Sequence, residues 1–102
     1  MGGTHQLHET RSLRMHRMVA ELFSQKPAEV IQFGLKNLER WQLQGVDCAD
    51  FKVWTNLLFT PSFGLVEALT GGSEEAIRLR QSSPFAGLIP EEARRQIVAS
   101  PQ

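Results

Sequence analysis

Few side chains in this sequence could carry covalent chemistry, and their spacing matches none of the usual catalytic arrangements. Ser82 and Ser83 are adjacent, but a serine nucleophile needs a base and a group that orients the base, and the sequence defines neither. Cys48 directly follows Asp47 and precedes Asp50, and this local negative charge disfavours the reactive thiolate. We therefore expect no enzymatic activity.

The histidines and glycines do not form a cofactor-binding pattern. His5 and His8 would need further ligands to hold a metal ion, and His16 follows eight residues later. Gly71 and Gly72 lack the preceding strand and the spacing of a phosphate-binding loop. The sequence thus predicts neither a metal ion nor another cofactor.

Composition narrows the class of partner. The chain has 102 residues, and its 11 basic and 11 acidic residues cancel. The overall positive charge of a nucleic-acid-binding protein is therefore missing. The sequence has a single cysteine, no signal-peptide pattern and no apolar run of membrane length. We expect a cytoplasmic protein with no membrane association.

Glycine and proline divide the chain into segments whose apolar residues recur with helical periodicity. We predict a flexible tail over residues 1–8 and a single all-α domain over residues 9–102, a compact bundle of five to six short helices. Pro27 suits a helix start, Gly45 a helix end, and Ser73 an N-cap. The predicted helices span approximately residues 9–25, 27–44, 49–59, 62–70, 74–81 and a last segment from residue 90. The predicted aromatic core residues are Phe23, Trp41, Phe51 and Trp54.

The second predicted helix carries a candidate partner-binding surface. Phe33 points away from the apolar stripe of this helix, and its helical neighbours are Lys36, Asn37 and Arg40. An exposed aromatic residue beside cations is typical of a protein–protein contact. The alternative is that another helix, such as the sixth, covers Phe33.

The segment from Arg80 to Pro90 is the most informative stretch of the chain. Two prolines and Gly87 exclude a regular helix or strand there, yet the segment retains large apolar residues. One interpretation is an ordered loop in which Phe85 fills the core of the bundle. The other is a recognition surface in which Phe85 contacts a partner, with Arg78 and Arg80 beside it.

Nucleic-acid binding is an alternative with weaker support. Arg14 and Arg17 on the first helix could contact phosphate groups, although Glu21 shares their face. Residues 62–82 can also be read as a helix-turn-helix motif, but the second helix would then begin with Glu74 and Glu75. These carboxylates would repel the DNA backbone at the end of the helix that normally reads it.

Three stretches resemble a group of small uncharacterised bacterial proteins that share a C-terminal RQSSPFAG signature. The signature lies within Leu79–Gly87 and is followed by Leu88 and Pro90-Glu-Glu. The other stretches are Arg11–Glu21 and Asn37–Trp41, the latter with Gly45 after it. The resemblance covers most of residues 11–95 and implies a compact helical protein with a loose association to antitoxin-like or regulatory roles. Relatives often carry a tryptophan after the Pro-x-Glu-Arg that follows the signature, whereas this chain reads Pro-Glu-Glu-Ala-Arg-Arg-Gln.

These observations favour a non-enzymatic protein–protein interaction module, antitoxin-like or regulatory, that acts on another bacterial protein. The alternatives are a small DNA-binding transcriptional regulator and a self-associating structural subunit, for instance a homodimer. The predicted partner-binding residues are Phe33, Lys36, Arg40, Arg78, Arg80 and Phe85.

Overall fold

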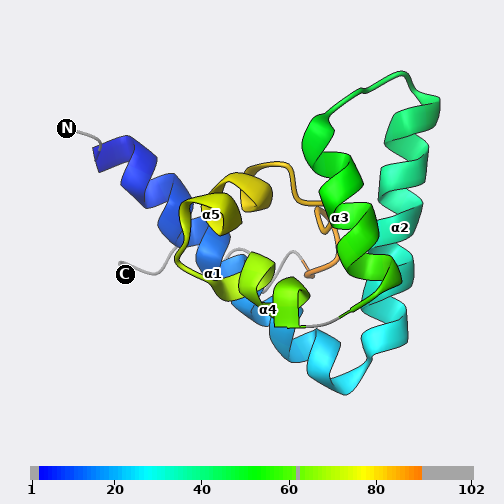
Figure 1. Ribbon diagram of the computed structural model, residues 1–102. Helices are drawn as coiled ribbons and strands as arrows, with labels where there is room; N and C mark the ends of the chain where they lie inside the picture. Colours follow the sequence, from blue (N-terminus) through cyan, green and yellow to red (C-terminus); the bar gives the residue numbers. More distant parts are fainter. Residues whose placement is uncertain (1–2, 62, 91–102) are drawn as a thin grey trace.

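The computed structural model describes residues 3–61 and 63–90, and the side chains from residue 10 onwards within these ranges; its helices form the predicted all-α bundle (Figure 1). The helices are α1 (Gly3–Gln25), α2 (Pro27–Leu43), α3 (Ala49–Phe59), α4 (Phe63–Thr70) and α5 (Glu74–Gln81). α2 and α3 form an antiparallel pair, while α4 and α5 pack together on α1. The helix predicted from Pro90 lies outside the described residues. In the described part of the chain, no helix is both long and apolar enough to cross a membrane.

α1 begins earlier than the sequence predicts. The helix starts at Gly3 instead of near residue 9, so residues 3–8 of the predicted tail are helical. Once a helix has nucleated, each further residue adds a hydrogen bond at little cost, and no proline interrupts Gly3–Gln25. The sequence prediction used apolar periodicity, which residues 3–8 lack, and a helix can extend without it.

The end of α2 confirms the role predicted for Gly45. Gly45 has a φ of 87°, in the left-handed region. Its N–H donates to the Gln42 carbonyl at 3.0 Å, and the Val46 N–H donates to the Trp41 carbonyl at 2.9 Å. This pair of bonds is a Schellman motif, which satisfies the last carbonyls of the helix and turns the chain towards α3.

The start of α5 confirms Ser73 as the N-cap. The Ser73 hydroxyl accepts a hydrogen bond from the Ala76 N–H at 3.1 Å, and the backbone of Ser73 is extended. The cap satisfies one of the free N–H groups in the first turn. α5 therefore begins directly after the short Gly71-Gly72 connection to α4.

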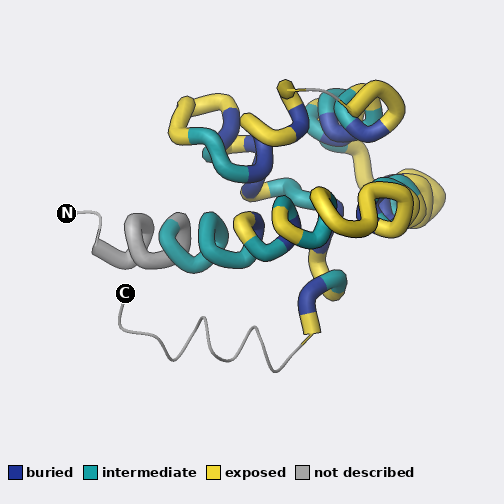
Figure 2. The backbone as a smooth tube through the Cα atoms, turned by 90° about the horizontal axis from the view of Figure 1, so that it is seen from below, coloured by how far each residue is buried: buried dark blue, intermediate teal, exposed yellow. Residues whose placement is uncertain are grey.

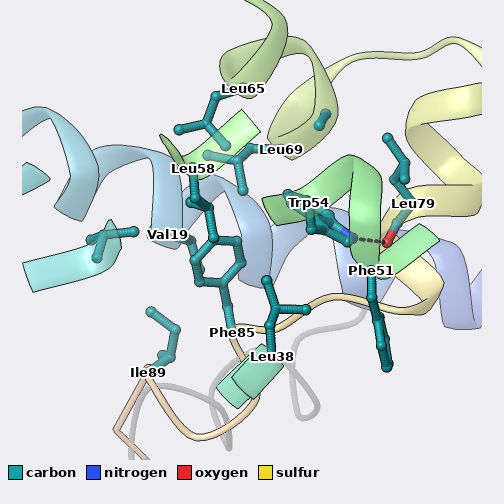
Figure 3. Close-up of a cluster of buried hydrophobic side chains, with 12 residues drawn as sticks. Val19, Leu38, Phe51, Trp54, Leu58, Leu65, Leu69, Leu79, Phe85 and Ile89 are labelled. Carbon is teal, nitrogen blue, oxygen red and sulfur yellow. Dashed lines mark hydrogen bonds between the residues drawn. The ribbon is translucent and has the colours of Figure 1, made fainter. Parts of the chain in front are cut away.

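One apolar core joins all five helices and the loop that follows α5 (Figures 2 and 3). Trp54 is fully buried at its centre, and its indole N–H donates to the Leu79 carbonyl of α5 at 2.9 Å. The predicted core residue Phe51 is also buried. Phe23 and Trp41 are only half-buried because they lie in the last turns of α1 and α2. Trp41 stacks on Phe51 with ring centroids 5.3 Å apart.

Candidate functional site

The loop after α5 is fixed to α2 by the side chain of Asn37. This side chain is buried, and its Nδ2 donates to the Pro84 carbonyl at 2.8 Å and to the Ala86 carbonyl at 3.5 Å. Gly87 has a φ of 90°, which lets the chain turn there. The loop is therefore an ordered part of the fold and belongs to the same packing unit as α2.

Phe85 fills the core and is not available to a partner. It is fully buried among the side chains of the core (Figure 3). Its ring meets that of Trp54 edge-on at 5.6 Å and that of His16 at 6.4 Å. Gly34 on α2 makes room for it, since a Cβ there would lie 3.1 Å from the Phe85 ring and 2.8 Å from Leu58. This burial corrects the expectation that Phe85 contacts a partner and matches the alternative in which it fills the bundle.

Arg80 is also buried, which corrects its prediction as a surface contact. Only 3% of the residue is exposed, and its Nη1 donates to the Ala68 carbonyl at 3.1 Å. Ala68 lies in the last turn of α4, where carbonyls have no partner within the helix. A cation is favourable at that end of a helix. Arg80 therefore ties α5 to α4.

Arg78 remains at the surface, where it joins α5 to α3. Its Nε lies 3.3 Å from Oδ2 of Asp50, and its side chain is 55% exposed. The guanidinium is therefore accessible to a partner, while the ion pair fixes its direction.

The surface predicted around Phe33 is only partly open. Lys36 and Arg40 are exposed, but Phe33 is half-buried. Its ring lies against the loop, 3.7 Å from the position that a Cβ on Gly87 would take. Arg40 Nη2 donates to the Asn37 Oδ1 at 2.7 Å. The loop therefore covers one side of Phe33, and the amide of Asn37 is buried. The exposed charged residues on this surface are Lys36 and Arg40.

The residues of the nucleic-acid alternative lie on α1 and α5. Arg17 is exposed on α1 and Arg14 is half-buried. Glu74 and Glu75 occupy the first turn of α5 and are both exposed. This negative end of α5 is the feature that the sequence predicted to oppose DNA binding.

The serines of the loop have structural roles. The Ser82 hydroxyl donates to the Leu79 carbonyl at 3.4 Å, and the Ser83 hydroxyl accepts from the Phe85 N–H at 3.2 Å. Within the residues that the structure describes, no three His, Cys, Asp or Glu side chains gather as a metal site would require.

The sequence did not predict a groove that lies between α3, α4 and α5. The groove encloses about 180 Å³. We call it the acidic groove, and it is lined by Val53, Leu57, Gly64, Glu67, Ala68, Ser73, Glu75, Ala76 and Leu79. It exists because small residues face one another there, with Gly64 and Ala68 one turn apart on α4 and Ala76 opposite on α5.

The helices that form the acidic groove carry further surface features outside its lining. The Asp50–Arg78 ion pair joins the first turn of α3 to α5. In the last residue of α3 and the first of α4, Phe59 is 69% exposed and Phe63 is 83% exposed. Phe63 directly precedes the lining residue Gly64. The groove itself has a mainly apolar floor with the carboxylates of Glu67 and Glu75 in its lining.

The sequence contains only weak signals of this groove. The small residues at positions 64, 68, 73 and 76 have the spacing of two facing helices, and Phe59 and Phe63 flank Pro61 at a helix corner. However, Leu57 belongs to the same apolar pattern as the buried Leu58. Only the packing of α4 against α3 decides which of them remains accessible.

Comparisons of the chain with protein-family models, with curated proteins and with solved structures give no match. The functional interpretation therefore depends on the residues of this chain alone.

Proposed function

We propose that the chain is a non-enzymatic protein–protein interaction module of a bacterial cytoplasm, antitoxin-like or regulatory, that occludes a site on another protein. The observation that carries the proposal is the accessible apolar floor of the acidic groove, on helices that also carry the exposed rings of Phe59 and Phe63. Accessible apolar surface and exposed aromatic side chains are both typical of a contact surface.

The proposal moves the main contact away from the residues predicted from the sequence. Arg80 and Phe85 stabilise the fold from within, so their substitution would test folding instead of binding. Arg78, whose side chain is exposed on α5, remains a candidate contact. Phe33, Lys36 and Arg40 form a second candidate surface on α2, distant along the chain from the groove.

The test is capture of a partner from the native bacterial extract with tagged wild type and two variants. Phe63→Ala removes the exposed ring that directly precedes the lining residue Gly64, and Leu43→Ala is the matched control because Leu43 is 82% exposed at the end of α2. Substitutions at such exposed sites change stability by at most about 0.5 kcal/mol. We expect one stoichiometric partner that Phe63→Ala releases and Leu43→Ala retains.

A further variant, with Lys36→Ala and Arg40→Ala combined, separates the two surfaces. Release by this variant and not by Phe63→Ala would place the contact on α2. Absence of any stoichiometric partner under gentle conditions would contradict the interaction proposal. A concentration-dependent dimer that Phe63→Ala dissociates would instead favour the self-associating subunit.

A further inference from the structure

The acidic groove has a charge pattern that points to one kind of occupant. The described residues that line it include two carboxylates, Glu67 and Glu75, and no lysine or arginine. Two cations lie nearby on α5: Arg78 pairs with Asp50, and the buried Arg80 donates to the carbonyl of the lining residue Ala68. The apolar floor is thus bordered by negative charge on α4 and on α5.

Glu67 lies at the negative end of the α4 dipole, which Arg80 offsets in part through its bond to the Ala68 carbonyl. It lies in the last turn of α4, where the helix dipole disfavours a carboxylate. Its carboxylate lies against the Cα of Gly71, and a Cβ at Gly71 would collide with Glu67 Oε2. A cation brought into the groove would offset this unfavourable charge. Glu75 lies in the first turn of α5, where the helix dipole favours a carboxylate, and its charge adds to the negative potential of the groove.

The spacing of the floor residues suits a helical partner. Val53 and Leu57 contribute to the floor from α3, four residues and about one helical turn apart. An amphipathic helix that docks in a groove uses apolar anchors spaced by three or four residues.

We infer that the acidic groove binds an amphipathic helical segment of a partner protein, with an apolar anchor on the floor and lysine or arginine side chains opposite Glu67 and Glu75. This inference rests on the proposed function, because it names the chemistry of the partner at the same groove. Oppositely charged groups at the rim steer the encounter and fix the register, while the apolar anchor provides most of the affinity.

Two synthetic helical peptides of about twelve residues test this inference on the full chain. Both carry leucines four residues apart; one has lysine at the flanking positions and the other has glutamate there. Binding is followed by ¹⁵N–¹H shifts of the Gly64, Ala68 and Ala76 amides. We expect saturable shifts at these three amides with the lysine peptide, at least about tenfold tighter than with the glutamate peptide and weakened by added salt.

Variants that remove carboxylate charges test whether the lysine peptide binds at the acidic groove. Glu67→Gln combined with Glu75→Gln should weaken binding of the lysine peptide about five- to tenfold, as expected for two partly exposed ion pairs. Glu74→Gln is the matched control, since it removes the same charge from the same turn of α5 but does not line the groove. We expect its affinity to stay within about twofold of wild type.

Several outcomes would overturn the inference: equal binding of both peptides, shifts confined to α1 or α2, or no shift with either peptide. Shifts of the groove amides with protein concentration alone would assign the groove to a second copy of this chain. These failures are distinct from failure of the proposed function. If the captured partner still depends on Phe63 while the peptides do not bind, the proposed function stands and the partner chemistry is wrong.

Discussion

At the scale of single residues, Phe85 and Asn37 convert a proline- and glycine-rich loop into part of the core. Phe85 enters the space left by Gly34, and Asn37 satisfies two loop carbonyls that the fold encloses. A buried carbonyl without a donor would cost more than the hydrogen bond itself contributes. The loop therefore depends on α2 for its conformation, and the core depends on the loop.

Substitution of Phe85 tests this role. Phe85→Ala should lower the free energy of unfolding by about 3–5 kcal/mol, because it removes a fully buried ring and leaves a cavity beside Trp54. Urea denaturation followed by tryptophan fluorescence measures the change. Phe63→Ala, which removes an 83% exposed ring, is the control and should stay within about 0.5 kcal/mol of wild type. An unchanged stability for Phe85→Ala would contradict the burial of this ring.

Asn37→Ala should be destabilising by about 1–3 kcal/mol, since it leaves the Pro84 carbonyl buried without its donor. Arg40→Ala, which removes the exposed partner of Asn37, should cost less than about 1 kcal/mol. The same urea titration compares the two variants. Equal losses would show that the network acts as one unit and that Asn37 has no special part in fixing the loop.

At the scale of helices, residues close in sequence to a helix end determine where most of the helices begin and end. Gly45 and Ser73 act on their own helix ends, so the sequence could predict them, and the structure confirms both. The burial of Arg80 could not be predicted in this way. The sequence places Arg80 correctly in a helix, but its burial depends on a hydrogen bond to the Ala68 carbonyl of another helix, α4. The accessible groove beside Leu57 depends in the same way on how α4 and α5 meet α3.

A pair of glycine substitutions tests the helix ends. Gly45→Ala should cost about 1–2 kcal/mol, because a left-handed φ of 87° disfavours a side chain although nothing lies near its Cβ. Gly72→Ala meets equally open space without such a φ, and it should be neutral or stabilise by about 0.4–1 kcal/mol through the unfolded state. Thermal unfolding by circular dichroism distinguishes the two. A stabilising Gly45→Ala would refute the Schellman end of α2.

The helix dipoles predict opposite effects for the two groove carboxylates. Glu67→Gln removes a negative charge from the last turn of α4 and should stabilise the free chain, whereas Glu75→Gln removes one from the first turn of α5 and should destabilise it. Each effect should be roughly 0.3–1 kcal/mol at low salt and smaller at high salt. Chemical denaturation at two salt concentrations provides the comparison. Effects of the same sign would remove the argument that Glu67 occupies an unfavourable position.

At the scale of the whole molecule, one core joins the five described helices, and the apolar floor of the acidic groove stays accessible. The sequence predicted the all-α bundle because the helical periodicity of its apolar residues, the N-cap residue Ser73 and the helix-ending residue Gly45 all indicate the same helices. It did not predict the acidic groove, because Val53 and Leu57 follow the same apolar pattern as residues that become fully buried. It also placed Arg80 and Phe85 on a surface that the packing of α4, α5 and the loop closes.

The central claim is that the chain binds another protein through the acidic groove. The most direct measurement is amide hydrogen exchange of the chain alone and in complex with the partner captured from the extract. We predict that binding slows the exchange of amide protons in α4 and in the first turns of α5 and leaves the exchange in α2 unchanged. Protection confined to α1 or to the Lys36–Arg40 region of α2 would contradict it.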